Sequence, residues 1–375
     1  MLSWLNLNER VFKHFNYLLI IQLLPIFFLS SWLIYEINPE LFKKQMIYYV
    51  VALIAFLVSV VIPWRLILWW LMPVLYGFNI LLLIAVDMFG KTILGAQRWL
   101  EIPGIGMTIQ PSEFIKVSVI MALAYIIRKN PPPKEGYGIK MFIIFSAIIL
   151  IPFVLIAKEP DLGTAMVLLI VGFGILFVIG IKKQIWLWLG TIVLLSAPLM
   201  YTYGLKTYQK QRIHDAISHP SYHVKQALIA IGSGGIGGKS KEDSTQTQMK
   251  FLPISSSDFI FAYLGERLGF LGMATVIFLY ILLILHLFYI GIQPFTDYLT
   301  KVFAIGLSWL FFVYMGVNVY MIIGLAPVVG IPLPMFSHGG TSFIIFAILF
   351  GILQNLIAFQ SYLGYNSDAK ISMVR

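Results

Sequence analysis

Long apolar runs recur along the whole chain and restrict its fold more than any other feature. Each run is at least about 18 residues long, which is enough for a helix to cross the ~30 Å hydrocarbon core of a bilayer. Charged residues make up 11% of the chain, against about 25% in a soluble globular domain. The sequence therefore predicts an all-α polytopic integral membrane protein.

The hydropathy pattern predicts about ten transmembrane helices. They are expected at residues 17–36, 46–62, 66–87, 112–128, 140–157, 162–181, 185–204, 270–291, 302–323 and 341–362. An even number of spans places both termini on one side of the membrane. We expect residues 1–375 to form a single transmembrane domain.

Lys and Arg residues in the short loops predict the orientation, because cytoplasmic loops carry an excess of them. With the N-terminus inside, twelve lie in the inner segments: Arg10, Lys13, Arg65, Arg128, Lys129, Lys134, Lys140, Lys182, Lys183, Lys301, Lys370 and Arg375. Five lie in the short outer loops: Lys43, Lys44, Lys91, Arg98 and Lys158. This bias predicts that both termini are cytoplasmic.

Three longer segments then face the outside: residues 88–111, 205–269 and 324–340. The second is a large extracytoplasmic loop between spans seven and eight. All three contain Gly and Pro, which interrupt helices. Irregular backbone at membrane depth persists only where it is buried in protein or lines a water-filled cavity. We therefore expect these segments to surround a cavity that opens outward.

Several classes of site are excluded or disfavoured. The chain has no cysteine, which excludes thiol catalysis and Cys-based metal sites. Its six histidines show no zinc-ligand spacing. The stretch GSGGIGGKS (232–240) resembles a phosphate-binding loop, but Ser233 stands where that motif needs Gly, so a tight or flexible turn is expected. The net charge of +10 suits cytoplasmic loops against anionic lipid, and we expect no nucleic-acid partner.

Glu113 and Lys116 are charged residues inside a predicted span, in the stretch QPSEFIK. Each would cost about 2.5–3.5 kcal/mol at mid-span, so pairing or function is expected. Their i, i+3 spacing places them on one helix face. Two interpretations stay open: a salt bridge near the interface that joins two helices, or a charged pair that lines a polar cavity.

Arg98 and Asp161 each have two interpretations. Arg98, next to Trp99 in GAQRWLEIPG, suits either an anchor at the membrane interface or a bidentate phosphate clamp. Asp161 stands at the start of a predicted span in KEPDLGTAM, where Asp commonly caps a helix.

Asp258 lies where the polar segment 205–269 meets the next apolar span, in SSSDFIFAYLGERLGF. The local pattern suits a helix N-terminus, so Asp258 could cap that helix. The same position, at the membrane edge beside an outward cavity, also suits a catalytic carboxylate. Glu266 in this stretch could pair with Arg267 or with another cation.

Seven motifs stand in the order found in the SEDS family of shape, elongation, division and sporulation proteins, and the resemblance covers nearly the whole chain. They are GAQRW, QPSEFIK, EPDLGTA, YQKQRI (208–213), GSGGIGGKS, DFIFAYLGERLGFLG and GIPLPMFSHGGTS (330–342). GAQRW and PDLGT are more similar to the elongation (RodA-like) branch than to the division (FtsW-like) branch.

The resemblance implies a peptidoglycan glycosyltransferase of the bacterial inner membrane. Its substrate would be lipid II, the undecaprenyl-pyrophosphate-linked disaccharide-pentapeptide, and its active site would face the extracytoplasmic side. The expected partners are a class B penicillin-binding protein acting as transpeptidase, the elongation machinery and membrane lipid. The essential acid of the family corresponds to Asp258. No cofactor is assured, and a divalent cation, Mg²⁺ or Mn²⁺, could assist.

Transfer from a pyrophosphate-linked donor needs a base for the acceptor hydroxyl and positive charge for the leaving group. Asp258 would be the base. Arg98, Lys116 and Arg212 would hold the pyrophosphate, and Glu113 would orient Lys116. Further motif residues are expected to shape the site: Gln110, Ser112, Asp161, Glu266, Ser337, Gly339 and Gly340.

The chain departs from the family pattern at four positions. Ile254 and Ser257 replace an acidic residue and a Thr before the essential acid, Ser240 replaces a Gly, and His338 replaces a Tyr. These changes affect fine positioning more than the chemistry. The main alternative function is a lipid II flippase, since charged residues and broken segments also suit a transport path. A division-specific polymerase is the other alternative.

Overall fold

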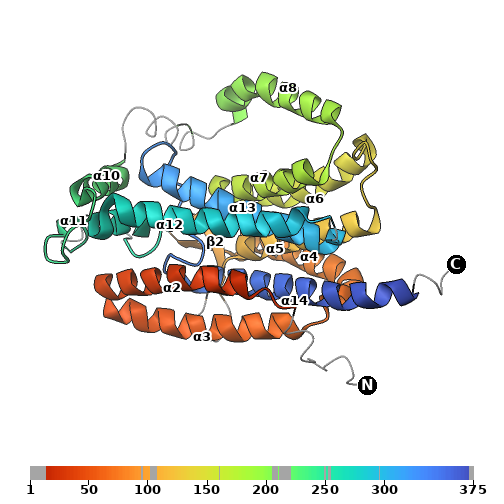
Figure 1. The fold of residues 1–375 in the computed structure, drawn as a ribbon. Coiled ribbons are helices and arrows are strands. Elements are labelled where there is room, and N and C mark those ends of the chain that lie inside the picture. Colours follow the sequence, from red (N-terminus) through yellow and green to blue (C-terminus); the bar gives the residue numbers. More distant parts are fainter. Residues whose placement is uncertain are drawn as a thin grey trace.

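The protein is an elongated bundle of long helices (Figure 1). The computed structural model describes residues 14–93, 96–101, 108–159, 161–204, 210, 221–248, 251, 255–294 and 296–370. Within these ranges the helices of 17 residues or more are α2 (Tyr17–Ile37), α3 (Pro39–Val61), α4 (Trp64–Phe89), α5 (Pro111–Lys129), α6 (Ile139–Lys158), α7 (Leu162–Ile179), α8 (Lys183–Leu199), α12 (Ile260–Ile292), α13 (Tyr298–Ile322) and α14 (Gly340–Lys370).

Each predicted span overlaps one of these helices, so the helical membrane fold is confirmed. Eight of the helices are long and apolar enough to cross a membrane. The other two are α5, which contains four charged residues, and α8, which has 17 residues. The count of ten spans therefore stays a prediction.

The first of the three segments expected to face outward, residues 88–111, is more regular than the sequence suggests. A small antiparallel sheet, with strands in the order β1 (Lys91–Ile93), β2 (Ala96–Glu101) and β3 (Thr108–Ile109), follows α4. Gln97 Nε2 donates to the backbone oxygen of Val86 at 3.0 Å, which ties β2 to the end of α4. Strands this short carry too few residues for their alternation to be recognised in a sequence.

The second segment expected to face outward, residues 205–269, also contains two helices, α10 (Tyr222–Gly234) and α11 (Thr245–Gln248). Before it, a short π-helix, η2 (Met200–Gly204), follows α8. In addition, α12 begins ten residues before the predicted span eight. Its backbone is broken at Gly269, whose φ of 63° is accessible to glycine at little cost. The stretch expected to be loop is therefore the first part of a kinked helix.

The stretch GSGGIGGKS packs backbone to backbone against α12. A Cβ on Gly234 would lie 2.0 Å from the carbonyl oxygen of Gly265, and one on Gly238 would lie 2.2 Å from that of Arg267. Phe270 N donates to Gly235 O at 2.9 Å, which adds a main-chain link. The glycines therefore permit a close helix contact, in agreement with a tightly turned segment.

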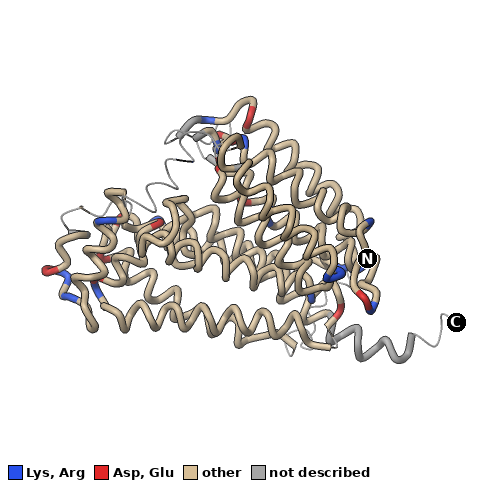
Figure 2. Tube along the Cα trace, turned by 90° about the horizontal axis from the view of Figure 1, so that it is seen from above, with Lys and Arg blue, Asp and Glu red and all other residues tan. Residues whose placement is uncertain are grey.

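The core lies along α13 and α5, which are buried on several faces, whereas α8 has no buried residue and stands apart from the other helices in Figure 1. Most charged residues lie toward the ends of the long helices (Figure 2), as expected when the middle of a bundle meets hydrocarbon. The segment between α13 and α14 folds back into the bundle and forms one wall of the site.

Candidate active site

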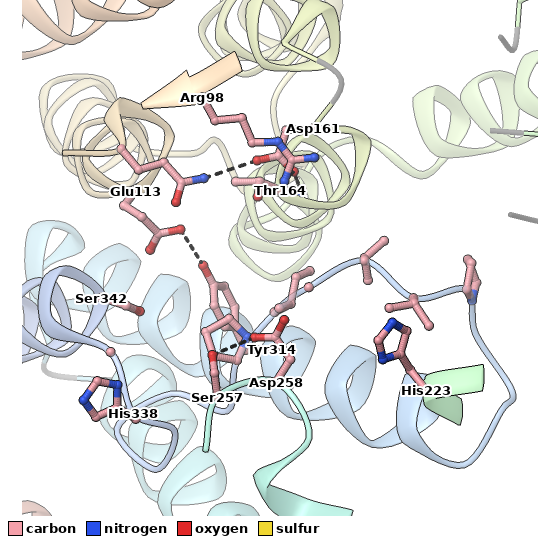
Figure 3. A pocket seen from close by; sticks show the side chains of 18 of the residues that line it. Arg98, Glu113, Asp161, Thr164, His223, Ser257, Asp258, Tyr314, His338 and Ser342 are labelled. Carbon is pink, nitrogen blue, oxygen red and sulfur yellow. Dashed lines mark hydrogen bonds and ion pairs between the residues drawn. The ribbon is translucent and has the colours of Figure 1, made fainter. Parts of the chain in front are cut away.

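A cavity of about 860 Å³ opens between α5, α7, α13 and the segment that precedes α14. Its lining includes the following residues that the sequence singled out: Arg98, Gln110, Glu113, Asp161, Asp258, Gly339 and Gly340. Figure 3 shows the side chains of Arg98, Glu113, Asp161 and Asp258 converging from separate elements. This convergence agrees with the expected cavity among broken segments.

Asp258 is held by a network that spans three parts of the chain. Ser257 Oγ donates to Asp258 Oδ1 at 2.9 Å. Asn318 Nδ2, from α13, donates to the backbone oxygens of Asp258 at 2.9 Å and Ile331 at 2.7 Å. Ser337 Oγ donates to the backbone oxygen of Ser257 at 2.8 Å. The turn before α12 is thus fixed against α13 and against the segment before α14.

Asp258 does not cap α12. The N-cap residue of this helix is Phe259, which makes no side-chain capping bond. The Asp258 carboxyl instead lines the cavity, and a Cβ on Gly330 would lie 3.4 Å from its Oδ2. Burial raises the pKa of this carboxyl, and the hydrogen bond from Ser257 opposes the rise. The interpretation as a helix cap is therefore wrong, and a side chain facing the cavity remains.

Glu113 and Lys116 form the expected pair. Lys116 Nζ donates to Glu113 Oε1 at 2.6 Å, and the Lys116 side chain is only 3% exposed. Lys116 Nζ also donates to Tyr314 Oη, and its distance to the Tyr314 ring centre is 4.8 Å. Tyr314 Oη in turn reaches Glu113 Oε1 at 3.5 Å (Figure 3). Glu113 and Tyr314 line the cavity, and Lys116 lies behind them.

Arg98 and Asp161 lie close together in the lining of the cavity. Arg98 Nη1 lies 3.5 Å from Asp161 Oδ1, and Gln110 Nε2 donates to Asp161 Oδ2 at 3.3 Å. Thr164 N donates to Asp161 Oδ1 at 3.2 Å, so Asp161 caps α7 as the sequence suggested. A capping carboxylate is stabilised by the positive end of the helix. Asp161 therefore serves as both a cap and an anchor for the guanidinium of Arg98.

The remaining predicted residues lie around or beyond the cavity. Ser112 is fully buried, and its hydroxyl has no hydrogen-bond partner within the described ranges. Ser337 braces the turn at Ser257 instead of lining the cavity. Glu266 is buried in α12 and accepts from Gln246 N at 2.9 Å, whereas Arg267 pairs with Glu36. Arg212 lies outside the described residues.

Sequence reasoning missed Tyr314, Asn318 and His223, although the spacing of Tyr314 and Asn318, four apart in an apolar span, was a usable signal. His223 comes from α10, and its ring stacks on Phe259. His338, noted as a departure, faces the cavity with a neutral ring, because burial and nearby Lys44 lower its pKa.

The described residues contain no group of three or more His, Asp or Glu side chains that could hold a metal ion.

The chain is similar in sequence to curated proteins over most of its length. The chain is 50% identical over 362 residues to the peptidoglycan glycosyltransferase MrdB of Helicobacter pylori (strain ATCC 700392 / 26695), covering 96% of this chain and 94% of that protein. It is 36% identical over 368 residues to MrdB of Escherichia coli (strain K12), covering 94% and 96%. It is 30% identical over 321 residues to a probable peptidoglycan glycosyltransferase FtsW of Geobacter sp. (strain M18), covering 84% and 86%.

Solved structures share the fold. The rod shape determining protein RodA of Thermus thermophilus matches with a TM-score of 0.66 and 25% identity, covering 92% of this chain and 96% of that one. A chain of a peptidoglycan synthase complex that coordinates polymerization and crosslinking matches with a TM-score of 0.79 and 24% identity, covering 92% and 98%. The family model of the FtsW, RodA and SpoVE cell cycle proteins matches residues 9–362. The chain therefore belongs to this family, the SEDS family that its motifs resemble.

Proposed function

We propose that this chain is a peptidoglycan glycosyltransferase of cell elongation that polymerises lipid II. The single observation that carries the proposal is the cavity in which Asp258 and Arg98 converge with the Glu113–Lys116–Tyr314 cluster. The relatives named MrdB are peptidoglycan glycosyltransferases, and they are more similar in sequence to this chain than the FtsW relative is. This difference favours the elongation role over the division role.

The mechanism is a single displacement. The acceptor sugar hydroxyl attacks the anomeric carbon of the donor, and the bond from that carbon to the pyrophosphate oxygen breaks. The electron pair leaves with the pyrophosphate, and the hydroxyl proton passes to Asp258. Burial supports this role, because the raised pKa of Asp258 makes its carboxylate a stronger base than an exposed Asp. One carboxylate is sufficient, because the donor already carries its leaving group.

Arg98 is the cation best placed for the pyrophosphate, since its side chain lines the cavity and its fork suits phosphate oxygens. Lys116 lies behind Glu113 and Tyr314, so it supports them and adds positive charge at short range. Arg212 stays a candidate from the sequence alone. Gly339 lines the cavity, and a Cβ there would meet nothing within 4 Å, which leaves room for the sugar; Gly340 also lines the cavity, but a Cβ there would meet the ring of Tyr48.

The proposed orientation puts the cavity on the extracytoplasmic side and both termini in the cytoplasm. Consistent with this, the first turn of α2 and the last turn of α14 lie at the same end of the bundle (Figure 1). We also propose that the whole chain acts as one transmembrane domain, with residues 205–269 as its large outer loop. A class B penicillin-binding protein is the proposed transpeptidase partner, as the family resemblance implies.

The test uses the full chain purified in detergent with its partner and supplied with lipid II. We expect glycan polymer from the parent and a loss of about 10²–10⁴ in rate for Asp258→Asn and Asp258→Ala. Asp243→Ala is the matched control, because Asp243 is exposed on the same loop and, within the described structure, its carboxylate accepts only from the Ser240 hydroxyl. Normal polymerisation by Asp258→Ala would refute the assignment of the base. A parent that makes no polymer in detergent but moves lipid II across vesicles would favour a flippase.

A further inference from the structure

Two acidic residues flank the turn between α6 and α7, and of these Asp161 lines the cavity whereas Glu159 does not. Glu159 is the C-cap residue of α6, and Asp161 is the N-cap residue of α7. Both are nearly inaccessible, with exposed fractions of 3% for Glu159 and 2% for Asp161. Two acidic side chains of the same chemical type thus occupy opposite helix ends within one short turn.

The two carboxyl groups differ in their hydrogen-bond partners. Asp161 has a backbone donor, an amide donor and the guanidinium of Arg98. Neither carboxyl oxygen of Glu159 has a hydrogen-bond partner among the residues that the structure describes. An ionised carboxylate that is buried without a partner is strongly disfavoured. The helix ends act in the same direction, because a C-terminus disfavours negative charge and an N-terminus favours it.

The charged groups around Glu159 come from three elements: Asp161 on α7, Asp87 at the end of α4, and Arg98 on β2. Burial raises the pKa of Glu159 to about 8, the charges of Asp161 and Asp87 add to the rise, and Arg98 opposes it. Glu159 is therefore protonated at neutral pH and loses its proton under mildly alkaline conditions. Asp161, and not Glu159, is the acid that pairs with Arg98.

We propose that Glu159 is a proton-carrying positioning residue for Arg98. When Glu159 is protonated it is neutral, so the Arg98 guanidinium pairs with Asp161 and is available to a ligand in the cavity. When Glu159 is deprotonated, it is a second anion near Arg98 and competes for the same guanidinium. Arg98 then binds a pyrophosphate less tightly. The consequence for substrate rests on the proposed function, whereas the protonation of Glu159 does not.

Infrared difference spectroscopy of the purified protein tests the protonation directly. Between about pH 6 and pH 9.5 we expect the parent to lose a carbonyl band of a buried carboxylic acid, and Glu159→Gln to lack this change. The control is Glu135→Gln, because Glu135 is 81% exposed and pairs with Lys182. This control should titrate like the parent. If Glu159→Gln shows the same band change as the parent, the proposal is wrong.

Affinity for a polyprenyl pyrophosphate, measured on the same samples, tests the positioning. We expect the affinity of the parent to fall at least about fivefold from pH 7 to pH 9.5. Glu159→Gln should bind within about twofold of the parent at pH 7. Its affinity should change much less than that of the parent between pH 7 and pH 9.5. A merely structural role would lower the thermal stability of Glu159→Gln and leave the fall in place. Equal falls in both proteins, or no binding by the parent at any pH, would overturn the proposal.

Glycan synthesis is recorded separately on these samples. If the parent makes no polymer while the band and the affinity behave as expected, the proposed polymerase function fails and the positioning role of Glu159 stands. If polymer forms but the band does not titrate, the positioning role fails and the polymerase function stands.

Discussion

Tyr314 and Asn318 stand one turn apart on α13, and they connect the two chemical groups of the cavity. Tyr314 bonds Lys116 and reaches Glu113 at 3.5 Å, while Asn318 holds the backbone oxygen of Asp258 at 2.9 Å. A helix is rigid over one turn, so the acid and the charged pair are fixed relative to each other by α13. We expect substitutions at these two positions to change catalysis more than stability.

The first prediction concerns the Tyr314 hydroxyl. Tyr314→Phe removes the hydroxyl bonded to Lys116 and keeps the ring, so about 1.5 kcal/mol of charge-assisted hydrogen bonding is lost. We expect kcat/KM for lipid II to fall about tenfold. Tyr320→Phe is the control, because Tyr320 lies on the same helix and is 55% exposed. Equal activity of the two variants would contradict a role for the hydroxyl.

The second prediction concerns the support of Asp258. Asn318→Ala removes two hydrogen bonds, to the backbone oxygens of Asp258 and Ile331, and leaves both carbonyls unsatisfied. We expect kcat to fall at least about tenfold while KM changes little, because misplacing the base by a fraction of an ångström slows proton transfer. Asn130→Ala is the control, since the Asn130 side chain donates to the backbone oxygen of Ile126 at the exposed end of α5, away from the cavity. A change in KM alone would argue against a positioning role.

The third prediction uses the pKa of Asp258. A base acts in its ionised form, so activity should be lost as pH falls through the pKa of Asp258, which burial raises above its usual value. Ser257→Ala removes the hydrogen bond that lowers this pKa, so the acid limb of kcat should move to higher pH. Ser240→Ala is the control, because the Ser240 hydroxyl bonds exposed Asp243 instead. An unmoved limb in Ser257→Ala would sink the assignment of the limb to Asp258.

The fourth prediction concerns stability and pH. The pKa of Glu159 is about 8 in the folded protein and about 4.3 in an unfolded chain, so the folded state binds more protons between these values. Unfolding free energy should therefore fall as pH rises from about 4.3 to about 8, and this contribution should be absent from Glu159→Gln. Thermal unfolding in detergent at several pH values measures the difference. Parallel curves for parent and variant would contradict the buried proton.

The fifth prediction concerns the close contact between α10 and α12. Gly234→Ala would place a Cβ 2.0 Å from the carbonyl oxygen of Gly265, so we expect a loss of at least about 1–3 kcal/mol in unfolding free energy. Gly232→Ala, on the same helix, meets nothing within 4 Å and should be neutral or stabilising by about 0.5–1 kcal/mol. Equal stability of the two variants would show that the contact between the backbones is not as close as described.

Features that depend on residues close together in the sequence were predictable from it. The helices follow from long apolar runs, the Glu113–Lys116 pair from its i, i+3 spacing, and the Asp161 cap from its place before α7. The support of Asp258 was not predictable, because Asn318 and Ser337 lie 60 and 80 positions away from the residues they hold. Tyr314 on its own is one uncharged aromatic residue in a membrane helix, so only its spacing from Asn318, four residues later, carries a signal.

The glycine contact between α10 and α12 also has a genetic consequence. Every other amino acid carries a Cβ, and at Gly234 and Gly238 that atom would collide with main-chain atoms, which cannot rotate away as a side chain can. Any nucleotide change that replaces either glycine therefore introduces a clash, whichever residue it encodes. These two codons should tolerate only synonymous changes in a population that depends on the protein, while the neighbouring codon for Gly237 should vary freely.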